Sequence, residues 1–464
     1  MVSRRRSFLD RDLEHYPATS RRVWYLALAV AATVVLYYEA YVLPSVSPLV
    51  LANFHITFIS YVLLNLASNL AGALSSLIGS FSDRIGRANL VVYGVIATSL
   101  VTLGIALTSA TALFIVLIVI LGFVEGIILV ATPALVRDFS PRLGRATAMA
   151  FWTVGPVGGS LLITLVASLT LPVFGTWQSQ YIIAGIFGLI ISALCFLGLR
   201  DLSPSLRAQI MTSMREKMLL EARSRGIDVA AALKNPWRQM LRPRIILSAL
   251  GISIFLLLYF AAVGYFPIYL STIFKYSLAL ANGLLSIYWV MDVIGSIVTG
   301  IVSDKLDVRK PFMVFGAIAN LLVILVFISR VGQPTDPVFM GILFAVLGFT
   351  GPIAYVGWMA GYTETVEDIN PALVATGISV WGFLVRLVVV VQTLAFGLVV
   401  VDIHNPGQWA TWWWVCVAGV IVFLPTAFLT SGYWSPAKAR AAVQAKLQEE
   451  GLGVAVPVEP TPTA

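Results

Sequence analysis

Long apolar runs alternate with short polar segments along nearly all of this 464-residue chain. A run of about 20 apolar residues is long enough to cross the hydrocarbon core of a bilayer as an α-helix. The pattern predicts two groups of six such helices, separated by a polar stretch at residues 200–244. The predicted spans are 24–46, 57–79, 90–108, 112–136, 146–170 and 178–199 in the first group, and 245–270, 279–302, 311–329, 338–361, 372–400 and 409–431 in the second.

The composition agrees with a membrane protein. Hydrophobic residues make up 59% of the chain, charged residues make up 11%, and the mean hydropathy is +0.91. Soluble domains have roughly 45–50% apolar and 25% charged residues. We therefore expect an all-α membrane protein with twelve transmembrane helices. Its expected parts are a tail at 1–23, a six-helix bundle at 24–199, a cytoplasmic linker at 200–244, a second bundle at 245–433 and a C-terminal tail at 434–464.

The positions of the cationic residues predict the orientation. If both termini are cytoplasmic, Lys275 and Arg330 lie in outer loops, Arg386 lies within a span, and the other 27 of the 30 Lys and Arg residues lie on the cytoplasmic side. Cytoplasmic loops of membrane proteins carry an excess of such residues. We therefore interpret the net charge of +8 as a topology signal and not as a sign of nucleic-acid binding.

The sequence lacks the patterns of a metal site or an ATPase. Cys195 and Cys416 lie far apart in predicted spans, and His15, His55 and His404 form no cluster with them. No Gly-x-x-x-x-Gly-Lys-Ser/Thr loop is present. We expect no metal, no cofactor and no enzymatic activity.

A repeated phrase indicates that the two groups of helices are copies of one unit. Residues 79–84 read Gly-Ser-Phe-Ser-Asp-Arg, and residues 300–305, 221 positions later, read Gly-Ile-Val-Ser-Asp-Lys. The phrase Leu-Gly-Phe recurs at 121–123 and 347–349. Many solute transporters build a central site from such duplicated bundles.

The first copy also resembles a motif of the major facilitator superfamily (MFS), Gly-x-x-x-Asp-Arg-x-Gly-Arg-Arg or Lys, between the second and third spans. Ala88 replaces the last basic residue. The matching residues are Gly79, Asp83, Arg84, Gly86 and Arg87. The resemblance implies two pseudo-symmetric six-helix bundles and a loop that closes the cytoplasmic side against the eleventh span.

The second copy of the motif is less complete. It keeps Gly300 and Asp304, but has Lys305 and, in place of the second glycine, Asp307. The cytoplasmic gate that the resemblance implies comprises Gly79, Asp83, Arg84, Gly86, Arg87, Gly300 and Asp304. Alternatively, these charges only fix the topology.

Four ionisable residues lie deep in predicted spans: Glu39, Glu125, Asp292 and Arg386. A charge at the bilayer centre costs at least about 2.5–3.5 kcal/mol, so such residues usually face a bundle interior or a wet cavity. In one interpretation Asp292 and Arg386 form a buried ion pair that only connects two helices. In the other, Glu39, Glu125 or Asp292 loads and releases a proton, and Arg386 attracts an anionic substrate.

Aromatic residues at a similar depth suit an organic solute that is partly apolar. Trp152 and Trp381 occupy equivalent positions in the repeat. The candidate substrate contacts are Tyr38, Trp152, Tyr265, Tyr288 and Trp381. Packing inside the bundles is the alternative role for each of them.

These features favour a secondary transporter of a small organic solute that works by alternating access as a proton-coupled symporter. Residues 155–160, Gly-Pro-Val-Gly-Gly-Ser, partly resemble a phrase of MFS antiporters. The alternatives are therefore a drug or metabolite efflux antiporter, or an uncoupled facilitator. A receptor would need a larger soluble domain than the 30-residue tail from Ser435. We expect a monomer in a cell membrane, the bacterial inner or plasma membrane, with protons and a small organic solute as its partners.

Overall fold

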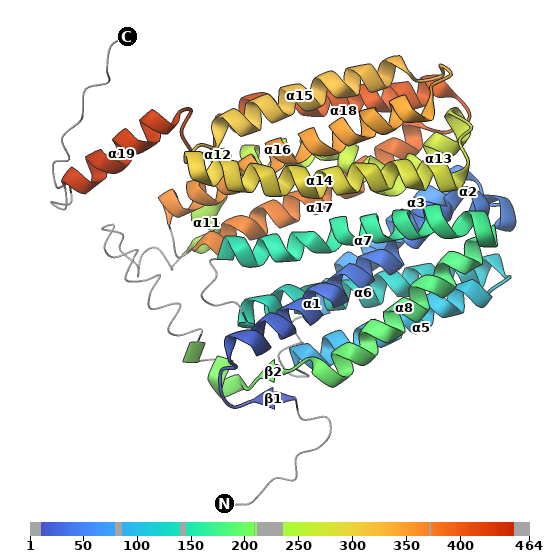
Figure 1. The fold of residues 1–464 in the computed structure, drawn as a ribbon, viewed down its shortest axis with the longest axis horizontal. Coiled ribbons are helices and arrows are strands. Elements are labelled where there is room, and N and C mark those ends of the chain that lie inside the picture. The colour runs from blue at the N-terminus through green and yellow to red at the C-terminus, as the bar shows by residue number, and fades with distance from the viewer. Residues whose placement is uncertain are drawn as a thin grey trace, which may run out of the picture.

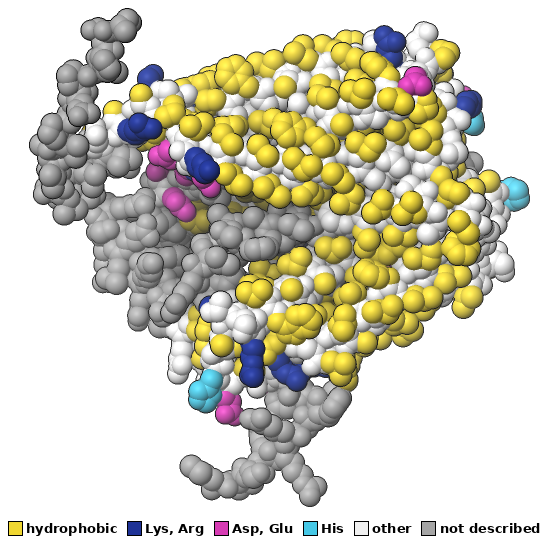
Figure 2. Space-filling model, in the orientation of Figure 1, with side chains coloured by type: hydrophobic (Ala, Val, Ile, Leu, Met, Phe, Trp, Pro, Cys, Tyr) yellow, Lys and Arg dark blue, Asp and Glu magenta, His cyan; other side chains and the backbone are white. Residues whose placement is uncertain are grey.

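A computed structural model describes residues 11–78, 86–139, 145–207, 209–210, 235–370 and 373–449. Within these ranges, twelve helices are long and apolar enough to cross a membrane, and they correspond one for one to the predicted runs. Exposed apolar side chains cover the sides of the helices, whereas the charged side chains seen in Figure 2 lie toward the two ends of the molecule. The molecule is a helical membrane protein.

The first six spans form one bundle (Figure 1). The first span consists of two helices, and each of the others is a single helix. In chain order the helices are α1 (Thr19–Ala40), α2 (Val42–Phe54), α3 (Phe58–Ile78), α5 (Arg87–Leu107), α6 (Thr111–Phe139), α7 (Arg145–Phe174) and α8 (Trp177–Gly198).

The last six spans form a second bundle beside the first, and α7 and α14 pack together at the boundary (Figure 1). A short helix precedes this bundle and α19 follows it. The helices are α11 (Pro236–Met240), α12 (Pro243–Phe255), α13 (Leu257–Ile273), α14 (Leu278–Leu306), α15 (Lys310–Ser329), α16 (Pro337–Ile369), α17 (Val374–Val399), α18 (Pro406–Ala427) and α19 (Pro436–Glu449). We call the end of the molecule with α19 the cytoplasmic end, as the charge pattern predicts, and the opposite end the outer end.

The first span of each bundle is interrupted, which the apolar runs did not predict. Tyr41 separates α1 from α2 with φ −92° and ψ 4°, and Leu256 separates α12 from α13 with φ −74° and ψ 4°. Pro44 explains the first interruption, because proline cannot donate a hydrogen bond to the carbonyl of Ala40 four residues earlier. No proline stands at the corresponding place after Leu256.

The repeated Leu-Gly-Phe phrase marks a close helix contact in each bundle. A Cβ atom on Gly122 of α6 would lie 2.2 Å from the hydroxyl oxygen of Ser68 in α3. A Cβ atom on Gly348 of α16 would lie 2.2 Å from the backbone carbonyl oxygen of Tyr288 in α14. Small residues let transmembrane helices approach closely. The phrase therefore sets the spacing of the second and fourth spans in both bundles.

Two short segments on either side of the first bundle pair at its cytoplasmic end. β1 (Asp12–Leu13) and β2 (Asp201–Leu202) form a two-stranded parallel sheet. Arg11 is 3% exposed, and its guanidinium donates to the carbonyls of Phe196 at 2.6 Å and Leu199 at 3.1 Å, at the end of α8. We call Arg11 with β1 and β2 the clasp. The polar stretch at 200–244 thus begins with a buried strand.

Candidate functional site

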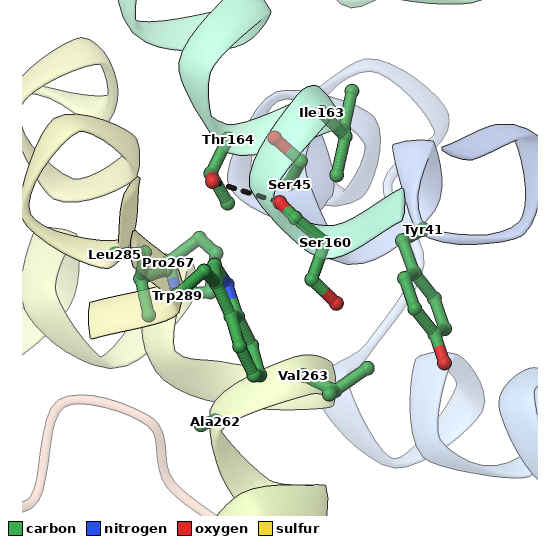
Figure 3. A pocket seen from close by; sticks show the side chains of 10 residues that line it. All are labelled: Tyr41, Ser45, Ser160, Ile163, Thr164, Ala262, Val263, Pro267, Leu285 and Trp289. Carbon is green, nitrogen blue, oxygen red and sulfur yellow. Dashed lines mark hydrogen bonds between the residues drawn. The ribbon is translucent and has the colours of Figure 1, made fainter. Parts of the chain in front are cut away.

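A narrow pocket of about 10 Å³ lies between the two bundles in this conformation (Figure 3). The first bundle contributes the interruption of its first span together with α2 and α7, and the second contributes α13 and α14. The lining residues are Tyr41, Ser45, Ser160, Ile163, Thr164, Ala262, Val263, Pro267, Leu285 and Trp289. Because both bundles line the pocket, a movement of one against the other changes its shape.

The hydroxyl of Ser160 points into the space between the rings of Tyr41 and Trp289 (Figure 3). Ser160 is 2% exposed, and its hydroxyl oxygen has no hydrogen-bond partner among the described residues. The hydroxyl of Thr164 donates to the backbone carbonyl of Ser160 at 2.8 Å. A buried polar group without a partner costs free energy. Ser160 is therefore a candidate contact for a polar group of a bound solute.

Tyrosines connect the pocket to acidic residues of both bundles. The rings of Tyr37 and Tyr41 are 5.6 Å apart, and both side chains interact electrostatically with Glu125 in α6. In the second bundle, Tyr259 of α13 interacts in the same way with Asp292 of α14, and also with Tyr37 and Tyr41. We call Tyr37, Tyr41 and Tyr259 the tyrosine layer. It connects one carboxyl group from each bundle.

The predicted ion pair between Asp292 and Arg386 is absent from this conformation. Asp292 is 8% exposed, and among the described residues no Lys or Arg nitrogen lies within 4.0 Å of its carboxylate. The two residues have different neighbours: Asp292 interacts with tyrosines of its own bundle, Tyr259 and Tyr355, whereas Arg386 interacts with Tyr37 of the opposite bundle. The helices that carry them also have different neighbours, because α14 packs mainly on α16 and α7, whereas α17 packs mainly on α12 and α3.

Glu39 lies inside the first bundle. Its side chain is fully buried, and the hydroxyl of Ser99 in α5 donates to it at 2.7 Å. Gly188 of α8 leaves room for this contact, because a Cβ atom there would lie 2.2 Å from the same carboxylate oxygen. The structure therefore brings Glu125, Asp292 and Arg386 to the tyrosine layer, and places Glu39 between α1, α5 and α8.

One of the predicted aromatic contacts lies beside the pocket. The ring of Tyr288 is 4.7 Å from that of Trp289, which lines the pocket. Trp381 packs against α16 instead. Its ring is 6.3 Å from that of Tyr355, and its indole N–H is buried with no hydrogen-bond partner among the described residues.

The other predicted aromatic contacts lie elsewhere. Tyr38 packs inside the first bundle, with its ring 5.9 Å from that of Phe187. Tyr265 lies toward the outer end and stacks on Phe396 at 3.8 Å. The side chain of Trp152 lies outside the described part of the structure.

The two bundles are joined on the outer side of the pocket. The ring of Phe58 at the start of α3 is 6.1 Å from that of Tyr265, and the Tyr61 hydroxyl donates to the carbonyl of Gly264 at 2.7 Å. Ser45 donates to the side-chain oxygen of Asn282 at 2.6 Å. Together these contacts close the outer side in this conformation.

Four polar residues at the interface were not among the predicted site residues: Ser45, Ser160, Thr164 and Asn282. The signal in the sequence is a small polar side chain within an apolar run. That signal is not specific, because hydroxyls elsewhere in the spans bond to their own helix, as Ser253 does to the carbonyl of Ala249 at 2.7 Å.

The predicted gate is described in part. Gly79, Asp83 and Arg84 lie outside the described residues. Gly86 has φ 92°, and Asp307, at the same place in the second copy, has φ 53°. Aspartate can adopt this left-handed conformation because its short side chain bonds locally. The second copy therefore keeps the turn although it has lost the glycine.

An arginine at the end of each copy of the motif forms an ion pair. Arg87 pairs with Asp138 at 2.9 Å. Arg309 pairs with Asp304 at 2.7 Å and with Glu364 at 2.9 Å. Burial alone would lower the pKa of the Arg309 guanidinium, but the bonds and charges of Glu364 and Asp304 together raise it above its ordinary value. A Cβ atom on Gly300 would meet nothing within 4 Å, so no helix among the described residues approaches that glycine closely.

Comparison with known proteins agrees with this architecture. One similar solved structure is that of a bacterial homologue of the human lysosomal transporter Spinster, in an inward-facing and unoccupied conformation. It superposes with a TM-score of 0.65 at 14% identity, over 92% of this chain and 98% of that chain. An inward-open conformation of the xylose transporter XylE from E. coli superposes with a TM-score of 0.62 at 15% identity over 91% of this chain and 99% of that chain. These similarities concern the fold.

Sequence comparison gives the family. A phosphoglycerate transporter protein of Salmonella typhimurium is 23% identical over 328 residues, which is 68% of each chain. Residues 28–393 match the sequence profile of the Major Facilitator Superfamily. The chain belongs to the Major Facilitator Superfamily and is a membrane transporter, not an enzyme.

Proposed function

We propose that this transporter moves a small organic solute by alternating access and couples the movement to protons. The observation that carries the proposal is the burial of two acidic side chains, Glu125 of the first bundle and Asp292 of the second, within electrostatic range of tyrosines at the interface beside the pocket. A coupling site must sense the solute and the relative position of the bundles. Carboxyl groups contributed by both bundles at one interface meet that requirement.

Alternating access supplies the steps of coupling. When the pocket opens to one side, water reaches the carboxyl groups and they exchange protons with it. When the bundles close, the loss of water disfavours the charged form of a carboxyl group. The proton then crosses with the solute. A proton that moves with the membrane potential gains about 2.3 kcal/mol per 100 mV, which can drive accumulation without ATP.

The names of two similar proteins support this class of function. One similar solved structure, at 15% identity and a TM-score of 0.61, is that of a D-xylose-proton symporter, covering 90% of this chain and 99% of that chain. The relative from Salmonella typhimurium is named for an organic phosphate. Both are named for small organic solutes. We further propose that the protein acts as a monomer in a bacterial inner membrane.

The antiporter-like phrase has a packing explanation. A Cβ atom on Gly155 would lie 2.4 Å from the side chain of Thr33, and one on Gly159 would lie 2.5 Å from Tyr37. The glycines let α7 pack against α1. This explanation needs no exchange of a drug for a proton, so symport is preferred over antiport.

Proton movement into proteoliposomes with a trapped pH dye tests the proposal. A panel of organic acids, sugars, amines and lipophilic drugs is screened for solutes whose uptake acidifies the lumen. Glu125→Gln and Asp292→Asn are expected to lower proton-driven accumulation by at least about tenfold, because they cannot release a proton. Both should keep exchange of labelled for unlabelled solute, which needs no net proton transfer.

One control accompanies these variants. Asp402→Asn removes an exposed carboxyl group in an outer loop. This control is expected to accumulate solute like the unmodified protein. Full accumulation in Glu125→Gln and Asp292→Asn would refute these coupling residues, and transport without any proton movement would establish a facilitator.

A further inference from the structure

Arg386 is the one Lys or Arg residue in the sequence that lies deep within a span. Its side chain is exposed, and among the described residues no carboxylate oxygen lies within 4.0 Å of it. An unpaired guanidinium in a membrane span must face water or a polar ligand, because contact with lipid is costly. The residues around Arg386 show whether its guanidinium faces lipid or the interior of the protein.

The lipid-facing side of α17 is a stripe that does not include Arg386. Its members are Phe383 (68% exposed), Leu387 (47%), Val391 (57%), Leu394 (44%) and Leu398 (79%). At about 100° per residue, Arg386 lies roughly 100° around the helix from the middle of this stripe. The guanidinium therefore does not project directly into lipid.

Arg386 instead shares a face with a residue that meets the first bundle. Gly382 and Gly397 follow the same helical stripe as Arg386. A Cβ atom on Gly397 would lie 3.0 Å from Val62 of α3. One turn before Arg386, a Cβ atom on Gly382 would meet nothing within 4 Å among the described residues. The stripe thus packs on the first bundle at Gly397 and meets no described atom at Gly382.

Arg386 lies within electrostatic range of a tyrosine that neighbours the pocket. Arg386 interacts electrostatically with Tyr37 of α1, whose ring is 5.6 Å from that of the pocket residue Tyr41. Beyond Tyr41, the unpartnered hydroxyl of Ser160 points between the rings of Tyr41 and Trp289 (Figure 3). A guanidinium, two aromatic rings and a free hydroxyl therefore follow one another along the interface.

We propose that the solute is a small organic monocarboxylate, whose carboxylate pairs with Arg386 and whose body lies between Tyr41 and Trp289, in reach of the Ser160 hydroxyl. This inference rests on the proposed transport function. Arginine binds a carboxylate through two parallel hydrogen bonds. Aromatic side chains suit the apolar part of the solute.

The balance of charge favours a monoanion over a phosphate ester. One guanidinium neutralises one negative charge. Two carboxyl groups, those of Glu125 and Asp292, interact with the tyrosine layer, and among the described residues no cation besides Arg386 does so. A dianion would leave one charge unpaired near these acids. A bound monoanion also disfavours the charged form of a nearby carboxyl group. Solute binding therefore promotes protonation of the coupling groups, which is the linkage that symport requires.

Matched pairs of solutes test the charge requirement. The probes are lactate, benzoate and phenylacetate, each with its neutral amide, and 3-phosphoglycerate as the phosphate ester. Uptake into proteoliposomes and the ligand-induced rise in melting temperature of the purified protein are both measured. We expect at least one carboxylate to be transported and to stabilise the protein, and its amide to do neither.

Variants of Arg386 connect this preference to one side chain. Arg386→Gln should lower carboxylate uptake at least about tenfold and abolish the rise in melting temperature, whereas Arg386→Lys, which keeps the charge, should lose less. Arg330→Gln removes an exposed cation from an outer loop and should behave like the unmodified protein. The melting temperature without ligand shows whether each variant is folded.

The outcomes separate this inference from the proposed function. If Arg386→Gln still takes up amides or sugars together with protons, proton-coupled transport is supported and the proposal of a monocarboxylate solute is wrong. Uptake of 3-phosphoglycerate alone would also overturn it, in favour of a phosphate ester. If carboxylate uptake needs Arg386 but moves no protons, the monocarboxylate solute is supported and the proposed proton coupling is wrong. If no carboxylate is bound or transported, the inference is wrong.

Discussion

At the scale of single residues, glycines fix how closely the spans approach. Gly122 and Gly348 occupy the same position in the repeat, and at each of them an added Cβ atom would meet backbone or short side-chain atoms of a neighbouring span. The carbonyl oxygen of Tyr288, 2.2 Å from the Cβ position on Gly348, cannot move without shifting α14. That helix also carries Asp292, so its position affects the candidate coupling site.

Gly348→Ala is therefore expected to destabilise the folded protein by about 1–3 kcal/mol, the usual effect of overpacking. Gly104→Ala is the matched control, because its Cβ atom would meet a single atom of Leu117 at 3.9 Å, an ordinary contact. Thermal unfolding of the purified proteins measures the difference. If both variants melt at the temperature of the unmodified protein, the close approach of α14 and α16 does not depend on the glycine.

At the scale of elements, the clasp connects the N-terminal segment to the cytoplasmic ends of three spans. Arg11 caps the last carbonyls of α8, where a cation is favoured by the helix dipole. Asp201 of β2 accepts a hydrogen bond from the backbone N–H of Ala88 at the start of α5 and pairs with Arg207. Arg207 in turn pairs with Asp138 at the end of α6 at 3.2 Å. These contacts hold the cytoplasmic end of the first bundle as one unit.

Arg11→Gln should loosen the clasp, because it removes charged hydrogen bonds worth about 1.5–3 kcal/mol each. Hydrogen exchange can detect this at two amides that pair across the sheet, those of Asp201 and Ser203, which donate to the carbonyls of Arg11 and Leu13 at 3.1 and 3.0 Å. Both should exchange faster in the variant. Arg21→Gln, at an exposed position of α1, is the control. Unchanged exchange in Arg11→Gln would show that the strands hold together without the arginine.

The number and order of the spans could be predicted because lipid leaves the chain few choices. Each crossing needs about 20 apolar residues in a helix that satisfies its own backbone. The directions of side chains could not be predicted in the same way, because most faces of a span are apolar. Glu39 and Glu125 both interrupt apolar runs, yet Glu39 points into its bundle and Glu125 interacts with the tyrosine layer.

The same limit explains the missing ion pair of Asp292 with Arg386. The eighth and eleventh spans were expected side by side, but α14 packs mainly on α16 and α7, and α17 packs mainly on α12 and α3. Which spans become neighbours depends on packing that a single sequence does not reveal. The interruption at Tyr41 did have a visible signal, because Pro44 removes the hydrogen bond to Ala40. It was missed because the apolar run continues through the break.

At the scale of the whole molecule, one apolar core continues from the second bundle into the outer part of the first, whereas the cytoplasmic part of the first bundle has a core of its own. Phe58, Tyr61 and Ser45 of the first bundle contact Tyr265, Gly264 and Asn282 of the second on the outer side of the pocket. For the pocket to open outward, these contacts must break and the outer ends of α7 and α14 must separate.

A disulfide between α7 and α14 tests that requirement. A Cβ atom on Gly283 would lie 3.6 Å from the Cβ atom of Ser168, which is within the range for a disulfide. In the double variant Ser168→Cys with Gly283→Cys, oxidation should form the bond readily, since the two native cysteines are buried. It should lower solute uptake into proteoliposomes at least about tenfold, and a reducing agent should restore uptake. Each single variant should be insensitive to oxidation. Full transport by the completely cross-linked protein would mean that the outer ends of α7 and α14 stay together throughout the cycle, and that the solute enters by a movement that leaves this contact intact.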